Sequence, residues 1–233
     1  LTAVQVGHRW GVGCYELRKT GGKRVPEFPQ QAVDTILQAM ARDAVRITAL
    51  SPGLLKRPQS WLGSATAVPA AWWERRDLRK ECEGRARHVL QRTCELARGF
   101  ETSTVILFTP EAITRGERRP CPEPILELLR GLACDAQHEG LTLALENEAD
   151  CWADTGAHTA QIVRAVNESN LKINWDPANA YLAGEVPYPD GYGHVRQHLV
   201  NVHAKDALPT TDPFQLDYEL IGKGKIDWPG QIR

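Results

Sequence analysis

The sequence has no surplus of charge of either sign and no long hydrophobic run. Its 233 residues include 28 lysines and arginines against 29 aspartates and glutamates, so the formal net charge is −1. Without a basic surplus, a chain has little long-range attraction for nucleic-acid phosphates or an anionic membrane surface. The longest apolar runs, at 104–108 and 141–145, are far shorter than the roughly 20 residues of a membrane-spanning helix. We therefore expect no nucleic-acid partner and no membrane span.

Paired cysteine motifs and a secretory leader are also lacking. None of the six cysteines stands in a C-x-x-C pair, and no charged and apolar leader precedes the domain. The hydrophobic share of 42% is that of an ordinary soluble globular protein. We interpret the cysteines as reduced thiols that pack as small hydrophobes in a cytoplasmic protein: Cys14, Cys82, Cys94, Cys121, Cys134 and Cys151.

Short strand-like segments alternate with amphipathic helical stretches along the whole chain. This alternation is typical of βα units that build a parallel sheet, in one domain over residues 1–233. We expect helices near 33–40, 77–98, 122–136, 159–168 and 190–198. The expected strands are Cys14–Arg18, Val45–Leu50, Thr104–Thr109, Leu141–Glu146, Leu171–Asp176 and Leu199–Ala204.

Such a series fits either a doubly wound sheet or most of a (β/α)₈ barrel. A doubly wound nucleotide fold should carry G-x-G-x-x-G after its first strand, but only Gly21-Gly22 occurs there. Polar residues instead stand at the carboxyl ends of the strands, which converge on one mouth in a barrel. The pattern therefore favours a barrel, with these residues at its mouth: Glu16, Glu146, Asp176 and His203.

Residues 51–76 interrupt the regular spacing with a stretch rich in glycine, proline, serine and tryptophan. Long loops in compact domains are usually lids or binding segments, and loops at this face of a barrel border the site. Alternatively, the tryptophans pack the loop onto the body of the protein. Both readings remain open for Trp61, Trp72 and Trp73.

Three apolar strands each end in a residue that can bind a metal ion: Glu146, Asp176 and His203. A carboxylate at the end of a buried strand is costly unless it is paired or coordinates an ion. Two carboxylates and one imidazole form a mixed oxygen and nitrogen set, which suits Mn²⁺, Co²⁺ or Mg²⁺ better than it suits zinc of the thiolate-bound type. Zn²⁺ is a further option. The alternative is purely structural: Glu146 in an ion pair, Asp176 as a cap and His203 as a packed side chain.

Four motifs together carry a family resemblance. They are Glu-Asn at 146, Asp-Pro-x-Asn at 176, His-x-Lys-Asp at 203, and Gly-Lys-Gly-Lys-Ile-Asp-Trp at 222–228. This order resembles the sugar phosphate isomerase/epimerase family, the xylose isomerase-like TIM barrels that include ketose 3-epimerases. The similarity covers residues 1–233 and implies a (β/α)₈ barrel with a metal site.

In that family a glutamate, an aspartate, a histidine and a last glutamate hold the metal. Glu146, Asp176 and His203 match the first three. The last glutamate is also catalytic and lies beyond the Gly-x-Gly-x-Ile-Asp-Trp segment, on the eighth strand. We therefore expect an incomplete barrel without the first and eighth strands and without that glutamate. Asn179 stands where several epimerases and apurinic endonucleases have histidine, which disfavours further metals and the endonuclease activity.

The resemblance implies a divalent-metal-dependent sugar or sugar-phosphate isomerase or epimerase. Proton transfer next to a carbonyl would pass through an enediolate, with Glu146 as one acid/base group. Two alternatives remain: a metal-dependent dehydratase of the inosose or dehydroshikimate type, or a barrel that binds a sugar without converting it. The expected partner is a small sugar or sugar phosphate, and a homo-oligomer is compatible with these features.

Several polar residues near the strand ends are candidate substrate contacts. Lys205 can supply positive charge to an anionic substrate, and Asp206 can cap the next segment or orient Lys205. We expect Trp175 and Trp228 to pack in the core rather than to stack on a sugar. The candidate substrate-binding residues are Asn147, Glu148, Asn179, Lys205, Glu16 and Arg18. For Asn147 and Glu148 the alternative is that they support the metal ligands from behind.

Overall fold

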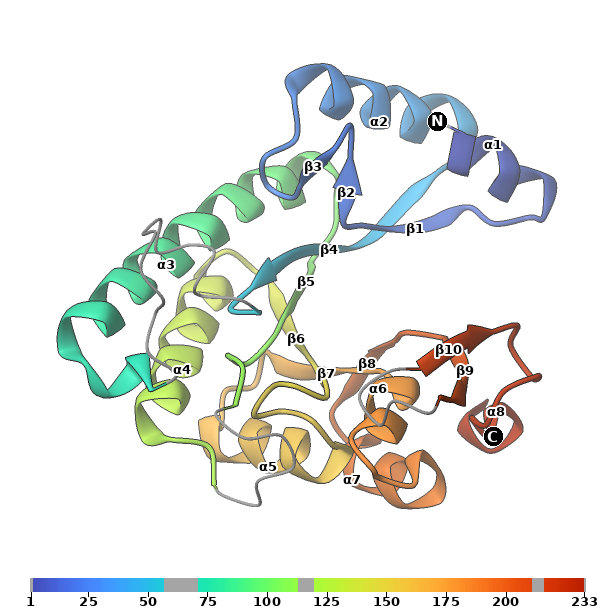
Figure 1. Cartoon of the computed structure of the whole chain (residues 1–233). Helices are drawn as coiled ribbons and strands as arrows, with labels where there is room; N and C mark the ends of the chain where they lie inside the picture. Colours follow the sequence, from blue (N-terminus) through green and yellow to red (C-terminus); the bar gives the residue numbers. More distant parts are fainter. Residues whose placement is uncertain (1, 57–70, 113–119, 211–215, 233) are drawn as a thin grey trace.

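The core of the protein is a curled sheet of six parallel strands (Figure 1). The computed structural model describes residues 2–56, 71–112, 120–210 and 216–232. The strand order β1-β4-β5-β6-β7-β8 confirms the predicted incomplete barrel, with β1 and β8 at the two edges of the described sheet. The strands are β1 (Cys14–Leu17), β4 (Arg46–Leu54), β5 (Thr104–Leu107), β6 (Thr142–Glu146), β7 (Leu171–Trp175) and β8 (Leu199–Val202).

Helices surround the convex side of the sheet, as Figure 1 shows. No helix of the described chain is long and apolar enough to cross a membrane. Two short helical turns add to the set, a 3₁₀ turn at Trp72–Glu74 and a π turn at Pro187–Gly191. The α-helices are α1 (Thr2–Arg9), α2 (Gln30–Asp43), α3 (Arg76–Gly99), α4 (Glu123–His138), α5 (Gly156–Val166), α6 (Pro177–Leu182), α7 (Tyr192–Val195) and α8 (Trp228–Ile232).

Side chains alternate between the two faces of the sheet. On β5 and β6, Val105, Leu107, Leu143 and Leu145 belong to the main core, which also contains the buried faces of α3, α4 and α5. The intervening residues Ile106 and Ala144 belong to a small separate cluster on the concave side, together with Ala49 and Phe108. Glu146 follows Ala144 on this side. The period of two therefore directs the carboxylate into the barrel interior.

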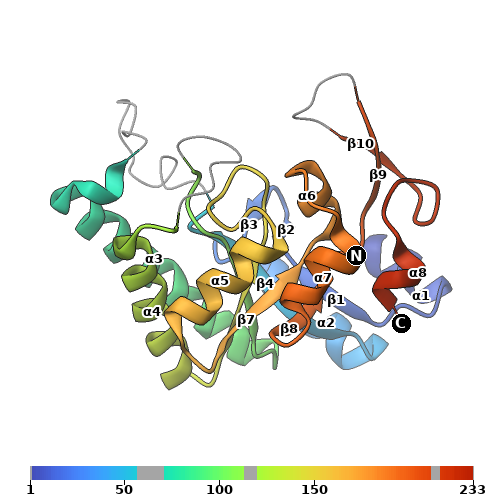
Figure 2. The ribbon, with the colours of Figure 1, turned by 90° about the horizontal axis from the view of Figure 1, so that it is seen from below.

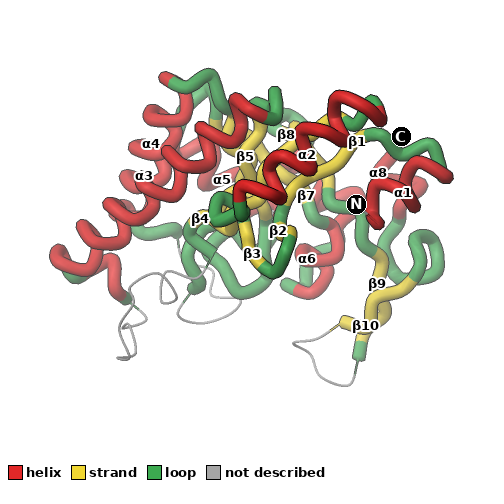
Figure 3. Tube along the Cα trace, turned by 90° about the horizontal axis from the view of Figure 1, so that it is seen from above, coloured by secondary structure: helices red, strands yellow, loops and turns green. Residues whose placement is uncertain are grey.

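Two small antiparallel hairpins lie outside the predicted series. One joins β2 (Lys19–Thr20) to β3 (Lys23–Arg24), and the other joins β9 (Asp206–Pro209) to β10 (Leu216–Glu219). Both hairpins and α6 lie toward the same end of the molecule (Figures 2 and 3). Strands of two to four residues carry too little periodicity for sequence reasoning to detect them. These hairpins bring additional side chains to that end.

The expected loop at 51–76 is shorter than predicted. Strand β4 continues through Pro52 and Gly53 to Leu54, where its pairing with β5 is irregular, so the proline is tolerated in the strand. Trp72 and Trp73 are buried, and Trp73 packs edge-on against Trp152 with ring centroids 5.9 Å apart. These two tryptophans therefore pack on the body. Trp61 lies outside the described residues, and the lid stays a prediction.

The helix expected at 190–198 is present in part. A π turn ends at Gly191 and continues directly into α7 (Tyr192–Val195), and the backbone is still helical at Arg196. Residues 196–198 form a turn that leads into β8. Before the predicted start, Tyr188 has extended backbone angles (φ −136°, ψ 132°), because a residue that precedes a proline avoids the helical region.

The cysteines are unpaired, as predicted. Cys82, Cys94 and Cys151 are buried, whereas Cys14 is exposed and does not act as a core residue. Burial raises the pKa of the Cys82 and Cys121 thiols to about 12. Thiols with such a raised pKa are poor nucleophiles at neutral pH.

Candidate metal centre and active site

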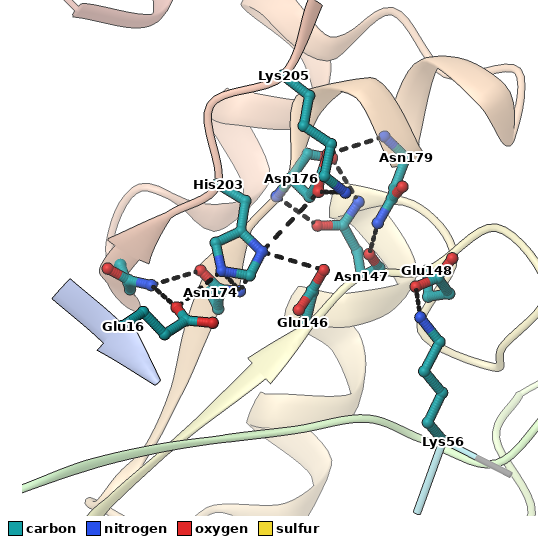
Figure 4. Close-up of polar contacts among 11 residues, drawn as sticks. Glu16, Lys56, Glu146, Asn147, Glu148, Asn174, Asp176, Asn179, His203 and Lys205 are labelled. Carbon is teal, nitrogen blue, oxygen red and sulfur yellow. Dashed lines mark hydrogen bonds and ion pairs between the residues drawn. The ribbon is translucent and has the colours of Figure 1, made fainter. Parts of the chain in front are cut away.

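Three predicted metal ligands meet at the carboxyl ends of neighbouring strands. Glu146 is the last residue of β6, Asp176 follows β7 directly, and His203 follows β8. One possible ligand atom from each residue lies within 4.8 Å of the others (Figure 4). The side chains of Glu146 and Asp176 are only 5% and 0% exposed, so both carboxylates are removed from water. Residues far apart in sequence thus form one polar cluster.

The His203 ring lies between carboxylates from several strands. Its Nδ1 atom is 3.2 Å from Glu146 Oε1 and 4.0 Å from Asp176 Oδ2, whereas Nε2 is 2.9 Å from Glu16 Oε2. The amide of Asn174 lies 3.2 Å from Nδ1. Nδ1 is therefore the ring atom that faces the Glu146 and Asp176 carboxylates.

The carboxylates change the protonation of this ring. Burial alone would lower the pKa of His203, but hydrogen bonds with Glu146 and Glu16 and their charges raise it to about 10. Burial alone would raise the pKa of Glu146, but the hydrogen bond and charge of His203 outweigh burial and lower it. In the metal-free protein at neutral pH, an imidazolium therefore supplies the positive charge between ionised carboxylates.

Asp176 is the most deeply buried carboxylate of the cluster. Its Oδ1 atom accepts a hydrogen bond of 3.0 Å from the backbone nitrogen of Asn179, which caps α6. Its Oδ2 atom has no hydrogen bond of regular geometry and makes an ion pair with Lys205 Nζ. Burial raises the pKa of Asp176 although the Lys205 charge opposes the change.

This donor set fits a divalent cation. A buried carboxylate oxygen that lacks a regular hydrogen bond lies beside a second carboxylate and an imidazole nitrogen. Oxygen and nitrogen donors of this kind are ligands of Mn²⁺, Co²⁺, Mg²⁺ and Zn²⁺. The residues that would hold such an ion are Glu146, Asp176 and His203.

Asn147 supports Asp176 from behind, which is one of the two roles predicted for it. The residue is fully buried, and its amide both donates to the Asp176 carbonyl and accepts from the Asp176 backbone nitrogen, each at 2.8 Å. Its own carbonyl accepts a 2.9 Å hydrogen bond from Asn179 Nδ2. Asn147 does not line the cavity beside the cluster. Its side chain instead fixes the ends of β6 and β7 relative to each other.

A cavity of about 610 Å³ lies over the cluster. This volume falls within the 300–1,000 Å³ range that is usual for small-molecule sites. Glu146 and His203 form part of its wall. Glu16 contacts His203 but does not line this cavity. The predicted substrate-binding residues that do line it are Arg18, Glu148, Asn179 and Lys205.

Sequence reasoning missed several polar residues around the cluster. Lys56 makes an ion pair with Glu148 and lies 4.7 Å from the centre of the Phe108 ring. Asn174 pairs in register with both Glu146 and Asn201, and its side chain accepts a 3.0 Å hydrogen bond from Asn201. Asn174 stands two residues before Asp176, so strand alternation was an available signal. Nothing in the sequence marked Lys56.

The glycine-rich motif at 222–228 is organised around Asp206. The Asp206 carboxylate accepts hydrogen bonds from the backbone nitrogens of Ala207, Gly222 and Ile226, at 2.8–3.1 Å. Burial alone would raise the pKa of Asp206, but these backbone hydrogen bonds lower it. The predicted capping role of Asp206 is therefore confirmed, and Lys205 has Asp176 as its partner instead.

The fold and site define an open parallel βα barrel with a carboxylate and histidine cluster at its C-terminal mouth. The xylose isomerase-like TIM barrel family matches residues 4–233, and the chain belongs to this family. No curated protein matches the chain.

Solved structures of the same fold include proteins with several activities. The IOLI protein, crystallised with a zinc atom, is 17% identical with a TM-score of 0.70, and the match covers 100% of this chain and 78% of that one. The probable 3-DHS dehydratase AsbF from Bacillus anthracis is 17% identical (TM-score 0.69; 98% and 80% covered). A D-psicose 3-epimerase in the presence of D-fructose is 15% identical (TM-score 0.63; 99% and 72% covered). At these identities the likeness shows the fold alone.

Proposed function

We propose that this chain is a divalent-metal-dependent isomerase or epimerase of a sugar or sugar phosphate. The reaction is proton transfer at a carbon next to a carbonyl group, through an enediolate. The observation that carries the proposal is the buried Glu146 carboxylate, which lies beside Asp176 and His203 and faces the cavity. Membership of a family whose solved relatives include a ketose 3-epimerase supports this choice of reaction.

Glu146, Asp176 and His203 would hold the ion. When bound, a divalent ion polarises the carbonyl oxygen and stabilises negative charge that develops there. Mn²⁺, Co²⁺ and Mg²⁺ suit the mixed oxygen and nitrogen set, and the zinc in the IOLI crystal keeps Zn²⁺ as an option. The metal-free cluster already places positive charge at this position, through His203 and Lys205.

Glu146 is the proposed base. The hydrogen bond and charge of His203 keep the pKa of Glu146 below its ordinary value despite burial, so the carboxylate is ionised at neutral pH. An ionised carboxylate at the cavity wall is in the protonation state that a general base needs and can face a bound substrate. Substrate hydroxyl groups would bind Glu148, Asn179 and Lys205, which line the same cavity.

Exchange of the substrate C–H proton with solvent tests the base directly, because exchange needs no second catalytic group. The protein is loaded with Mn²⁺ and incubated with a panel of ketoses and ketose phosphates in D₂O. We expect deuterium at the carbon next to the carbonyl, and at least a 100-fold loss of exchange in Glu146→Gln. Glu127→Gln, on the exposed face of α4, is the matched control.

The same experiment separates the alternatives. Apart from the incorporated deuterium, an isomerase or epimerase gives a product with the composition of the substrate, whereas a dehydratase gives one that has lost a water molecule. Binding of a sugar by the folded, metal-loaded protein without exchange on any member of the panel would leave a sugar-binding barrel. Equal exchange by wild type and Glu146→Gln would contradict the role of Glu146.

A further inference from the structure

An ion pair forms part of the wall of the cavity over the metal cluster. Lys56 Nζ lies 2.5 Å from Glu148 Oε2, and both residues line the cavity (Figure 4). Their side chains are 24% and 21% exposed, so both charged groups are accessible from solvent. A ligand in the cavity can therefore reach the two partners of this pair.

The ends of three neighbouring strands hold the pair in place. Lys56 follows β4 in a turn, in which its backbone nitrogen donates a 3.1 Å hydrogen bond to the Gly53 carbonyl. Phe108 follows β5, and the Lys56 ammonium lies 4.7 Å from the centre of its ring, within the range of a cation–π contact. Glu148 follows β6, and its backbone nitrogen donates a 2.8 Å hydrogen bond to the Ala153 carbonyl. The pair is thus positioned before any ligand binds.

The strand order separates this pair from the metal cluster. Glu146 ends β6, and Asp176 and His203 follow β7 and β8, on one side of it. Lys56 follows β4, which lies on the other side of β6 in the sheet. The charge of Lys56 still reaches Glu146 and helps to lower its pKa. A substrate whose reacting carbon faces Glu146 can therefore extend its other end toward the Lys56–Glu148 pair.

The pair offers both hydrogen-bond donors and acceptors to a ligand. An ammonium group has three donors, and Lys56 directs one of them to Glu148. Within the part of the chain that the structure describes, Glu148 Oε1 accepts no hydrogen bond. Every sugar hydroxyl both donates and accepts. One hydroxyl can therefore donate to Glu148 while its neighbour on the next carbon accepts from Lys56.

Charge makes an anionic group a poor ligand for this part of the cavity. Both lysines that line the cavity already have carboxylate partners, Lys56 in Glu148 and Lys205 in Asp176. Arg18 also lines the cavity, but its side chain is exposed, where salt screens its attraction for an anion. A phosphate beside Lys56 would meet the like charge of Glu148. An uncharged group meets no such repulsion.

We propose that Lys56 and Glu148 form a subsite for two neighbouring hydroxyl groups of an uncharged sugar. The subsite binds the part of the sugar that extends away from the metal cluster, and it selects substrates by the presence and configuration of those hydroxyls. This inference rests on the proposed function, because it narrows the substrate of the same cavity from sugars and sugar phosphates to sugars without an anionic group.

Binding can be measured without catalysis on polyols, which have no carbonyl group. Xylitol, ribitol and D-arabitol are titrated into the full chain, with EDTA and with Mn²⁺, and ligand-observed NMR measures Kd. We expect at least one of them to bind, and both Lys56→Met and Glu148→Gln to weaken that binding about tenfold or more. Arg98→Met, which removes an exposed ion pair with Glu139, should bind like wild type.

Dihydroxyacetone separates the subsite from a general effect on the active site. This ketose has the carbonyl group and a neighbouring C–H bond but no hydroxyl groups beyond them. Deuterium exchange is compared between dihydroxyacetone and D-fructose or the most active ketohexose of the panel. In Lys56→Met and Glu148→Gln we expect kcat/KM to fall about tenfold more for the ketohexose than for dihydroxyacetone, mainly through KM.

Four results would overturn the subsite. They are equal losses on the two ketoses, no binding of any polyol, polyol affinities that neither variant changes while thermal denaturation shows both to be folded, and a higher kcat/KM for D-fructose 6-phosphate than for D-fructose. Exchange that depends on Glu146 but not on Lys56 or Glu148 removes the subsite and keeps the proposed function. Polyol binding that depends on the pair, without exchange on any sugar, removes the proposed function and keeps the subsite.

Discussion

Glu16 Oε2 lies 2.9 Å from His203 Nε2, although the two residues are 187 positions apart. Glu16 is in β1 and His203 follows β8, and these strands lie at opposite edges of the sheet. The curl of the sheet brings β1 and β8 close enough for their side chains to meet. A histidine that binds a metal through one nitrogen is usually oriented by a hydrogen bond at the other. Glu16 accepts at Nε2, so Nδ1 is left to face Glu146 and Asp176 (Figure 4).

Removing the Glu16 carboxylate should weaken metal binding. In Glu16→Gln the His203 ring loses a charged acceptor, so the ring is held less firmly and becomes less basic. We therefore expect Mn²⁺ affinity to fall by about tenfold or more. Titration followed by electron paramagnetic resonance measures the affinity. Glu27→Gln, an exposed carboxylate elsewhere on the surface, is the control. An unchanged affinity in Glu16→Gln would show that Glu16 does not orient the ring.

The metal-free protein should lose stability at alkaline pH. The pKa of His203 is raised from 6.5 to about 10 in the folded state, so its contribution is fully present below pH 6.5 and is lost as the pH rises through about 10. We expect the free energy of unfolding to fall between pH 7 and 10 more steeply in wild type than in His203→Gln. Urea denaturation with EDTA at several pH values measures both slopes, and parallel slopes would contradict the raised pKa.

Metal binding should compete with protons at the same ring. The ion needs neutral His203, so binding at neutral pH releases the proton that the carboxylates hold there. We expect Mn²⁺ affinity to rise with pH from 6 to 9. Calorimetry in buffers with different ionisation enthalpies counts the released protons, and a count near zero at pH 7 would contradict a protonated His203.

Lys205→Met should destabilise the metal-free protein. The variant leaves the buried Asp176 carboxylate without its cation, and we expect a loss of about 1–3 kcal/mol in the free energy of unfolding. Saturating Mn²⁺ should reduce the difference from wild type, because the ion replaces the missing charge. Lys223→Met, at an exposed position, should have little effect. A full-sized loss that Mn²⁺ does not reduce would argue against Asp176 as a metal ligand.

Asn147→Ala should cost about 2–4 kcal/mol of unfolding free energy. The substitution leaves the backbone nitrogen and carbonyl of Asp176 buried without their partners. We expect metal affinity to fall in the same variant, because Asn147 fixes the position of Asp176. Asn147→Gln, which keeps the amide but displaces it, should not restore either property. Guanidinium denaturation and Mn²⁺ titration measure the two effects, and a stable variant with normal affinity would contradict the positioning role.

Much of the architecture can be predicted from the chain alone. Buried parallel strands appear as short apolar runs, and all six of the predicted strands occur in the sheet, because burial on both faces demands such runs. The ends of the strands were also informative at Glu146, Asp176 and His203, since a polar residue directly after an apolar run lies at the mouth of a barrel.

Sequence patterns predicted the bounds of some elements wrongly and missed the shortest strands. The helix expected at 190–198 has its last residues in a turn that leads into β8, and the irregular pairing of β4 lets Pro52 continue a strand that was expected to end there. The hairpin strands β2 and β3 have only two residues each, so no periodicity marks them. Arg24, at the end of that hairpin, therefore gave no sign of its hydrogen bond with the Ser51 carbonyl.

The sequence by itself determined which elements form and which residues can bind a metal. Only the tertiary structure decided how the polar groups are paired: Glu16 with His203, Lys205 with Asp176, and Asn147 with the backbone of Asp176. The physical reason is that hydrogen bonds and ion pairs depend on distances of a few ångströms between side chains. The curvature of the sheet sets those distances, and residues separated by many positions in the chain acquire them only when the strands curl around a common interior.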